Sequence, residues 1–257
     1  AYRHRQPVRP PPMILWLNRK AKALAVRLNG GVHPKHDLPE RFGSYWYVHH
    51  VPMGSAIVDV GCGNGRHLLR VADRGDVLVG LDMDLRALAM AGVDSAERGL
   101  IVHWLQHDVT LPWPCSTRGY EVVLMLDILE HLETRARLAV LAQAGRVLAP
   151  SGVLILAVPN GYTWWKRLLR LVGADSRSDP DHRIEYSVSE LAMELADAGF
   201  GITECPPSVI DMPLVGLLDV LGAIWPWPYW WATWCRLRLG DWSRENAVGF
   251  NVVARRR

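Results

Sequence analysis

The chain has 257 residues, 49% of them hydrophobic and 21% charged, so it can bury a full core and is predicted to form one domain with appendages. Its net charge of +3 is too small to imply a polyanionic partner by itself. The four cysteines have neither metal-ligand spacing nor an obvious pairing pattern, so we expect reduced thiols in a cytoplasmic setting and no bound metal. Twelve tryptophans against three phenylalanines is an unusual composition.

The N-terminal part, residues 1–39, is basic and has no acid before Asp37. Residues 1–12 are rich in proline, which predicts an extended arm. Met13–Leu28 mixes apolar and basic residues and predicts an amphipathic helix, which either packs on the domain or contacts a membrane surface. Its apolar stretch is too short for a secretory signal, although acid-free, arginine-rich segments also occur in organelle transit peptides.

A strand, a tight turn and a helix are predicted over Ile57–Ala72. The turn contains Gly61, Gly63 and Gly65, whose lack of a Cβ lets a ligand approach the backbone. A dinucleotide-binding G-x-G-x-x-G would need glycine at Arg66, and the strand-end Asp59 would repel a pyrophosphate but attract an ammonium group. The turn therefore predicts a cofactor that carries a cation, and S-adenosylmethionine fits.

Strands and helices continue to alternate, which predicts a parallel sheet with right-handed crossovers. The expected strands are Val77–Leu81, Leu100–Gln106, Tyr120–Leu126 and Val153–Val158, and the expected helices are Asp84–Ala96 and Ala136–Leu148, the latter stopped by Pro150. Ligands of such sheets bind outside the carboxyl ends of the strands. Four acids are predicted at those ends and should converge on one rim: Asp59, Asp82, Asp108 and Asp127.

The C-terminal third contains a helix, Ser187–Gly199, and two strands, Gly201–Cys205 and Ala247–Arg255, separated by an insertion at residues 206–246. The insertion is apolar and tryptophan-rich, but Pro226 and Pro228 would break a membrane-spanning helix. Its tryptophans neighbour arginines in the sequence, a pattern that favours either a membrane interface or the wall of a binding site for a hydrophobic substrate.

A second tryptophan-rich segment, Gly161–Gly173, predicts an amphipathic helix. Its apolar face would contain Trp164, and its polar face would contain Lys166. That apolar face is expected to cover a substrate or a membrane surface, or to face the core.

The motifs together resemble class I S-adenosylmethionine-dependent methyltransferases, in the small-molecule and lipid-acting branch of the ubiquinone-biosynthesis type. Asp59–Gly65 resembles the first motif, Asp127–Leu132 the "EHL" segment, and Arg146–Gly152 the "vLkPGG" turn. The resemblance implies an α/β, Rossmann-like sheet of seven strands, mostly parallel, with an antiparallel last strand. It divides the chain into the N-terminal arm and helix (1–39), a methyltransferase core (40–205), the insertion (206–246), and a final strand with a basic tail (247–257).

The resemblance also implies the site. Asp82 would bind the ribose diol, since one carboxylate can accept from both hydroxyls, and Asp108 would face the adenine amino group. The full cofactor set is Asp59, Gly61, Cys62, Gly63, Gly65, Asp82, Met83, Asp108, Val109 and Asp127, with S-adenosylhomocysteine as product. The expected substrate contacts are Tyr45 and Trp46, where relatives fold a helix over the cofactor, together with Trp164 and Tyr186.

The implied reaction is methyl transfer to a hydroxyl, or another nucleophile, of a hydrophobic or lipid-linked small molecule at a membrane surface. The candidate general bases are His131, beside Glu130, and His182, near Glu185. One alternative is an RNA methyltransferase that uses the basic arm and Arg255–Arg257, although the nucleic-acid Asp-Pro-Pro-Tyr segment is absent after the fourth strand. The other is a non-catalytic cofactor-binding subunit with the insertion as its partner surface.

Overall fold

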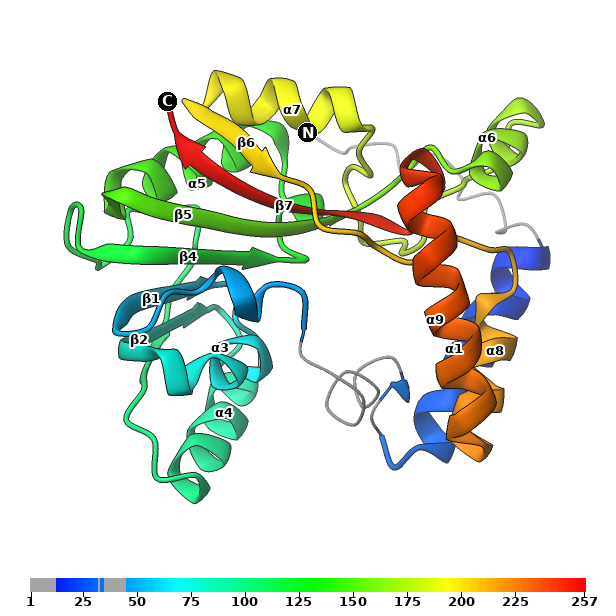
Figure 1. Ribbon diagram of the computed structural model, residues 1–257, viewed down its shortest axis with the longest axis horizontal. Helices are drawn as coiled ribbons and strands as arrows, with labels where there is room; N and C mark the ends of the chain where they lie inside the picture. The colour runs from blue at the N-terminus through cyan, green and yellow to red at the C-terminus, as the bar shows by residue number, and fades with distance from the viewer. Residues whose placement is uncertain (1–12, 32, 35–44) are drawn as a thin grey trace, which may run out of the picture. The chain divides into compact units, whose positions relative to one another are not determined.

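A computed structural model describes residues 13–31, 33–34 and 45–257, which group into two compact units (Figure 1). The helical unit contains the described residues before position 35 together with Gly161–Pro180 and Ser208–Val248. The sheet unit contains residues 45–160, Asp181–Pro207 and Gly249–Arg257. Each unit is built from segments that are far apart in the sequence.

The sheet unit is built on a seven-stranded sheet in the order β3-β2-β1-β4-β5-β7-β6. The strands are β1 (Ser55–Val60), β2 (Gly75–Asp82), β3 (His103–Gln106), β4 (Tyr120–Leu126), β5 (Leu148–Pro159), β6 (Phe200–Glu204) and β7 (Gly249–Arg256). The first five pair in parallel, and β7 runs antiparallel to both of its neighbours. The structure thus confirms the predicted Rossmann-like sheet with an antiparallel last strand.

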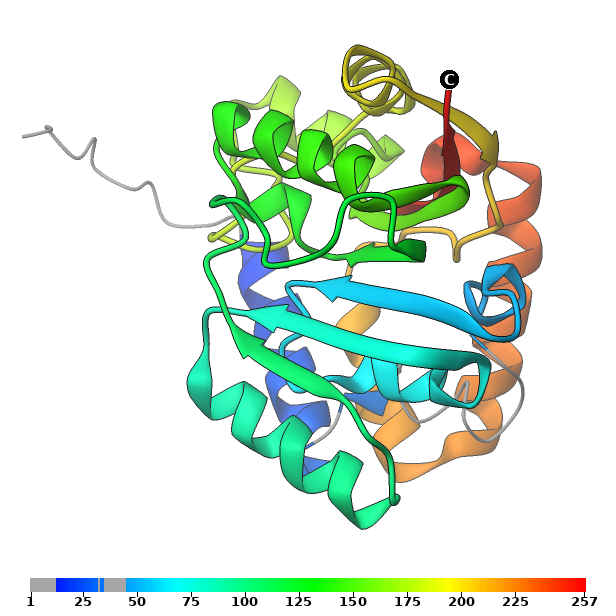
Figure 2. The same ribbon diagram turned by 90° about the vertical axis from the view of Figure 1, so that its left-hand side faces the viewer.

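Both faces of the sheet are buried, as alternation along the central strands requires. On β4, Val123 and Met125 belong to one apolar cluster, while Val122 and Leu124 belong to another on the opposite face. The helices of this unit are α3 (Arg66–Arg70), α4 (Leu85–Glu97), α5 (Thr134–Val147) and α7 (Val188–Asp197), with 3₁₀ turns at Val48–His50, Ala72–Arg74 and Leu129–His131. Figure 2 shows the strands of the sheet side by side.

Most predicted boundaries differ from the structure by a few residues, and two of the differences have a clear physical reason. The third strand begins at His103 rather than Leu100, because the Leu100 amide donates to the Ser95 carbonyl and closes the end of α4. Pro150 does not stop α5, since β5 already begins at Leu148 and includes that proline. The predicted start of α7 was correct, because Ser187 and Glu190 form a reciprocal capping box there.

The helical unit consists of α1 (Met13–Leu28), α6 (Trp164–Leu171), α8 (Val215–Ile224) and α9 (Pro226–Trp242), with a 3₁₀ turn at Arg244–Asn246. A polar cluster is buried among them: the Tyr229 hydroxyl donates to Asp219 at 2.7 Å, and the His33 Nε2 lies 3.4 Å from the same carboxylate. α9 begins at Pro226, so that proline interrupts the apolar insertion as predicted, whereas Pro228 breaks no helix and lies in the first turn of α9. None of the described helices is long and apolar enough to span a membrane.

The segment Gly161–Pro180 belongs to this helical unit through buried hydrogen bonds. The Thr163 hydroxyl and the Trp165 indole both donate to Asp211, at 3.0 and 2.8 Å. Lys166, expected on an exposed polar face, is instead fully buried and donates to the Ser178 hydroxyl at 2.8 Å. The reason is that α6 buries the face carrying Trp165 and Lys166, whereas Trp164 is exposed.

Candidate functional site

The loop between β1 and α3 is fastened to the end of β2. The Gly61 and Cys62 amides both donate to the Leu81 carbonyl, at 2.8 and 3.0 Å. The Gly63 amide donates to Asp82 Oδ2 at 2.7 Å, and the Asp84 amide donates to Asp82 Oδ1 at 2.8 Å. Asp82 therefore holds the glycine loop as well as standing at a strand end, a link that the sequence pattern did not predict.

Gly63 and Gly65 have left-handed φ angles of 53° and 74° for which side chains are poorly suited. A Cβ on Gly63 would meet nothing within 4 Å, so the backbone there is open to a ligand. A Cβ on Gly65 would overlap the Trp104 ring and would lie 2.9 Å from the Ala91 Cβ. The two glycines thus serve different purposes, ligand access and internal packing.

This difference predicts unequal stability losses. Gly63→Ala should cost about 1 kcal/mol of unfolding free energy, from backbone strain alone. Gly65→Ala should cost about 3 kcal/mol or more, because a buried overlap with an indole adds to the same strain. Urea denaturation of both variants measures the difference. Equal losses would contradict the packing role of Gly65.

Asp59 is 1% exposed, and its Oδ2 has no hydrogen-bond partner among the described residues. Burial, reinforced by the negative charge of Asp82, raises the pKa of Asp59 from 3.8 to about 7. A buried carboxylate oxygen without a partner is costly unless a ligand supplies a donor. A cationic donor fits this position well, whereas a pyrophosphate would meet two carboxylates.

The other predicted cofactor residues border the same strand ends. Met83 is 70% exposed, and its carbonyl accepts from the Gln106 side chain. Asp108 accepts from the Thr110 amide and hydroxyl, and these hydrogen bonds hold its pKa below the usual range. Val109 is buried, with its carbonyl bound to the Trp113 indole.

Cys62 has a buried thiol whose pKa is raised by burial, so it is an inert thiol at neutral pH.

Asp127 directly follows β4 and has a left-handed φ of 59°, which is unusual for a residue with a side chain. Its amide donates to the Ala157 carbonyl of β5 at 3.1 Å. The chain then turns directly into the 3₁₀ turn Leu129–His131. This bend positions Glu130 and His131 just beyond the carboxyl end of β4, and such backbone strain tends to occur at functional sites.

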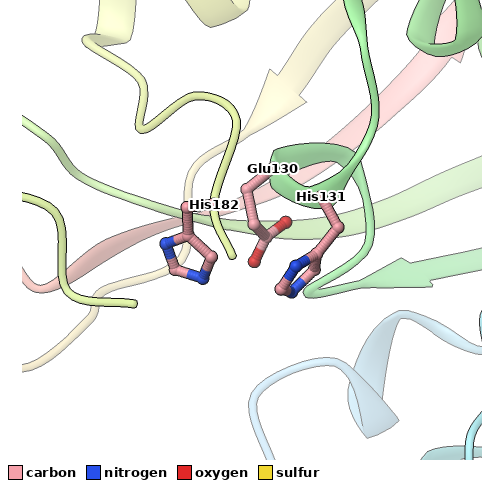
Figure 3. A group of neighbouring side chains, drawn as sticks. All are labelled: Glu130, His131 and His182. Carbon is pink, nitrogen blue, oxygen red and sulfur yellow. The ribbon is translucent and has the colours of Figure 1, made fainter. Parts of the chain in front are cut away.

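Glu130, His131 and His182 come together there, as Figure 3 shows, with the Glu130 carboxyl between the two imidazoles in that view. One side-chain donor atom from each lies within 4.8 Å of the others. The two imidazole rings are 5.0 Å apart and nearly perpendicular. The segment carrying His182 is anchored to this turn because the Arg183 and Ile184 amides both donate to the Glu130 carbonyl. The sequence pattern predicted both histidines as candidate bases, but it did not predict that they are neighbours in the fold.

His182 also lies against a second carboxylate: its Nδ1 is 2.8 Å from Glu185 Oε1, and both residues are buried. A carboxylate at Nδ1 favours the tautomer with the proton on that nitrogen, so Nε2 is the basic atom. Burial, with the nearby Asp127 charge, raises the pKa of Glu130 to about 8. The group of Glu130, His131 and His182 can accept and hold protons, and its donor spacing could also hold a metal ion.

The aromatic residues before β1 pack on α3. The Tyr47 hydroxyl is 2.9 Å from His67 Nδ1, and the Arg70 guanidinium stacks 3.9 Å above the Tyr45 ring. Trp46 packs edge-on against Tyr47. Tyr45 and Trp46 are thus joined to the helix that follows the glycine loop, while residues 40–44, part of the helix expected over the cofactor, lie outside the described residues.

The two remaining predicted substrate residues have different surroundings. Trp164 belongs to the helical unit and is 48% exposed, with its amide bound to the Asn246 side chain. Tyr186 is fully buried in the sheet unit, and its amide donates to the Pro159 carbonyl. Tyr186 therefore supports the loop that carries His182 and does not present an exposed contact surface.

Comparisons with known proteins associate this arrangement of glycine turn and sheet with methyltransferases. Residues 57–152 match the model of a family described as a methyltransferase domain. The matched segment lies within the sheet unit, and solved S-adenosylmethionine-dependent methyltransferases share the fold of that unit.

Among relatives, the ubiquinone biosynthesis O-methyltransferase of Haemophilus ducreyi is 32% identical over 152 residues, covering 57% of this chain and 63% of that protein. The protein of the same name from Saccharophagus degradans is 27% identical, covering 72% and 81%. The first match thus spans less than two thirds of its relative's length. Magnesium protoporphyrin IX methyltransferase of Synechocystis, solved with S-adenosylhomocysteine, shares the fold with a TM-score of 0.57 at 16% identity, covering 93% of this chain and 87% of that chain.

Proposed function

We propose that the protein transfers a methyl group from S-adenosylmethionine to a hydroxyl of a hydrophobic or lipid-linked small molecule at a membrane surface. The observation that carries the proposal is the pair of sites at the strand ends. A glycine loop is edged by the buried carboxylate of Asp59, whose Oδ2 has no partner among the described residues, and the group of Glu130, His131 and His182 follows β4. The O-methyltransferase name of the relatives supports the choice of a hydroxyl acceptor.

The cofactor contacts are proposed from this chain's own residues. Asp59 would attract the ammonium group of the amino-acid end, since its Oδ2 has no other donor. Asp82 would accept from the ribose hydroxyls while its two oxygens keep the loop amides, because a carboxylate has about four acceptor sites. Met83, Asp108, Val109 and Asp127 would border the nucleoside. When bound, S-adenosylmethionine supplies a methyl group on a sulfonium.

His182 is proposed as the base for the acceptor hydroxyl. Glu185 fixes the orientation of its ring, so that Nε2 can take the proton. His131, 5.0 Å away between ring centres, would orient the hydroxyl, and the Glu130 carboxyl, protonated at neutral pH by its raised pKa, would donate a hydrogen bond. Orientation of the acceptor would supply much of the rate, since methyl transfer is an in-line displacement.

The experiment is a labelled-methyl assay with matched acceptors. Phenols and catechols are offered with and without a long alkyl chain, and the products are identified by mass spectrometry. The proposal expects O-methylated product, with kcat/KM higher for the chain-bearing acceptor of each pair. Label found in RNA from a cell extract would instead support an RNA methyltransferase. Cofactor binding without any methylated product would support a non-catalytic cofactor-binding subunit.

The raised pKa of Asp59 predicts a pH-dependent cofactor affinity. If the ionised carboxylate pairs with the ammonium group, the Kd of S-adenosylmethionine should rise as pH falls below about 7, approaching tenfold per unit. Calorimetry between pH 5 and pH 7 tests this, a range in which the cofactor's own amine stays protonated. Asp59→Asn should bind more weakly but with a flat pH profile.

Protein stability provides the control for that variant. Because the folded pKa of Asp59 lies above its ordinary value of 3.8, the ionised form is disfavoured in the folded state. The wild type should therefore lose stability relative to Asp59→Asn as pH rises from about 4 to about 7. A flat difference across that range would show that Asp59 is not the titrating group.

A further inference from the structure

The helical unit carries exposed apolar stripes that the proposed reaction does not use. We infer that these stripes of α1, α6, α8 and α9 bind the surface of an anionic lipid bilayer. The inference deepens the proposed function and rests on it, because binding to a bilayer would bring the enzyme to a hydrophobic acceptor. Bilayer binding is measured without methyl transfer, so either proposal can fail alone.

The stripe on α9 shows the pattern most plainly. Trp227, Trp231 and Trp234 are 66%, 63% and 46% exposed and recur at the spacing of one helix face. The next position on that face is Arg238, whose guanidinium lies 5.3 Å from the Trp234 ring centre. The opposite face is buried through Tyr229, Arg236 and Gly240. The exposed face of α9 is therefore apolar, and contact with a partner is more favourable for it than contact with water.

α1 repeats the arrangement. Its buried face carries Leu15, Ala21 and Ala25. The exposed face carries Met13, Leu17, Lys20 and Leu24, which again follow helical spacing. Lys20 lies 5.7 Å from the ring of the half-exposed Trp16. Apolar side chains interleaved with cations are typical of helices that lie in the membrane interface.

α6 and α8 add two shorter stripes. On α6, Trp164 and Leu168 are exposed beside Arg167 and Arg170. On α8, Leu217, Leu221 and Ile224 share an outer face, while Gly216, Asp219 and Gly222 are buried. All four helices of the unit therefore turn large apolar side chains outward.

The charges on these helices indicate which partner binds the apolar stripes. On these four helices the acids are Asp219, which is buried, and Asp241, whereas α1 and α6 carry basic residues and no acid. A second copy of the same surface would bring like charges together, which opposes a symmetric dimer. Anionic headgroups complement the cations, and tryptophan prefers the interfacial depth of a bilayer. The proposed contact is made by the outer faces of these helices, which lie in the membrane interface.

Flotation of the whole chain with lipid vesicles tests the inference. Wild type should float with vesicles of phosphatidylcholine and phosphatidylglycerol, and more weakly with phosphatidylcholine alone. Trp231→Ser with Trp234→Ser should lower binding to both vesicle types by tenfold or more. Lys20→Gln with Arg238→Gln should lower binding only to the anionic vesicles, by about fivefold per residue.

Matched controls come from the sheet unit. Ile101 is 86% exposed and Arg135 is also exposed, so Ile101→Ser and Arg135→Gln should float like the wild type. Circular dichroism of each variant checks that it is folded. The inference is overturned if folded wild type stays in the dense fraction with both vesicle types, or if the control variants lose as much binding as the stripe variants. It is also overturned if the tryptophan variant only dissociates an oligomer.

Discussion

Replacing His182 with alanine should lower kcat by about 10²- to 10⁴-fold, the usual contribution of a positioned general base. The Kd of S-adenosylmethionine should be unchanged, because the contacts proposed for the cofactor are made by other residues. The physical reason is the 2.8 Å hydrogen bond to Glu185, which orients the imidazole beside His131. Single-turnover assays and calorimetry on the same preparation measure the two quantities separately.

Three further variants make that result specific. Glu185→Gln keeps a hydrogen-bonding side chain but removes the charge, so it should cause a smaller loss than His182→Ala. His131→Ala should impair turnover through orientation, whereas His103→Ala, an exposed histidine on β3, should have no effect. If His182→Ala and His131→Ala both kept full turnover, neither histidine would be the base. Activity lost on chelation and restored by a divalent metal would instead assign the group of Glu130, His131 and His182 to a metal ion.

Local patterns predicted the parallel strands of the sheet, whereas the antiparallel last strand was predicted from the family resemblance. The strand before Gly61 and the strand ending at Asp82 are fixed by apolar runs that meet turn residues, and both were found where they were expected. The boundaries that failed depend on contacts outside the segment, such as the hydrogen bond from Leu100 to Ser95 that ends α4. Periodicity also could not reveal that Lys166 is buried, because its partner Ser178 follows in a loop with no helical pattern.

The neighbouring histidines and the assembly of the helical unit also depend on tertiary contacts that local sequence patterns do not predict. His131 and His182 are neighbours because the Arg183 amide returns to the Glu130 carbonyl, a long-range contact without a sequence motif. α1 packs with α8 through the Gly216 amide, which donates to the Asn18 side chain at 2.6 Å. Composition predicted that both segments were amphipathic or apolar. Their assembly into one unit depends on tertiary contacts that composition does not contain.

Asp82→Ala should weaken S-adenosylmethionine binding by about 100-fold. Two hydrogen bonds to a charged group contribute about 3 kcal/mol, and that energy corresponds to a factor of about 100 in Kd. The structure adds a second reason, since Asp82 accepts the Gly63 and Asp84 amides and the variant would also release the glycine loop. Calorimetry with S-adenosylmethionine measures the effect.

Asp84→Ala is the matched control for that measurement. Asp84 is an exposed acid two residues further on, and it caps α4 by accepting from the Arg86 and Ala87 amides. Losing the cap should cost about 1 kcal/mol of stability without changing the affinity for the cofactor. Asp82→Asn keeps one acceptor oxygen, so its loss should lie between the wild type and Asp82→Ala. An Asp82→Ala protein that binds S-adenosylmethionine as tightly as the wild type would remove the carboxylate from the ribose site, because neither the hydroxyl contacts nor the loop anchor would then matter.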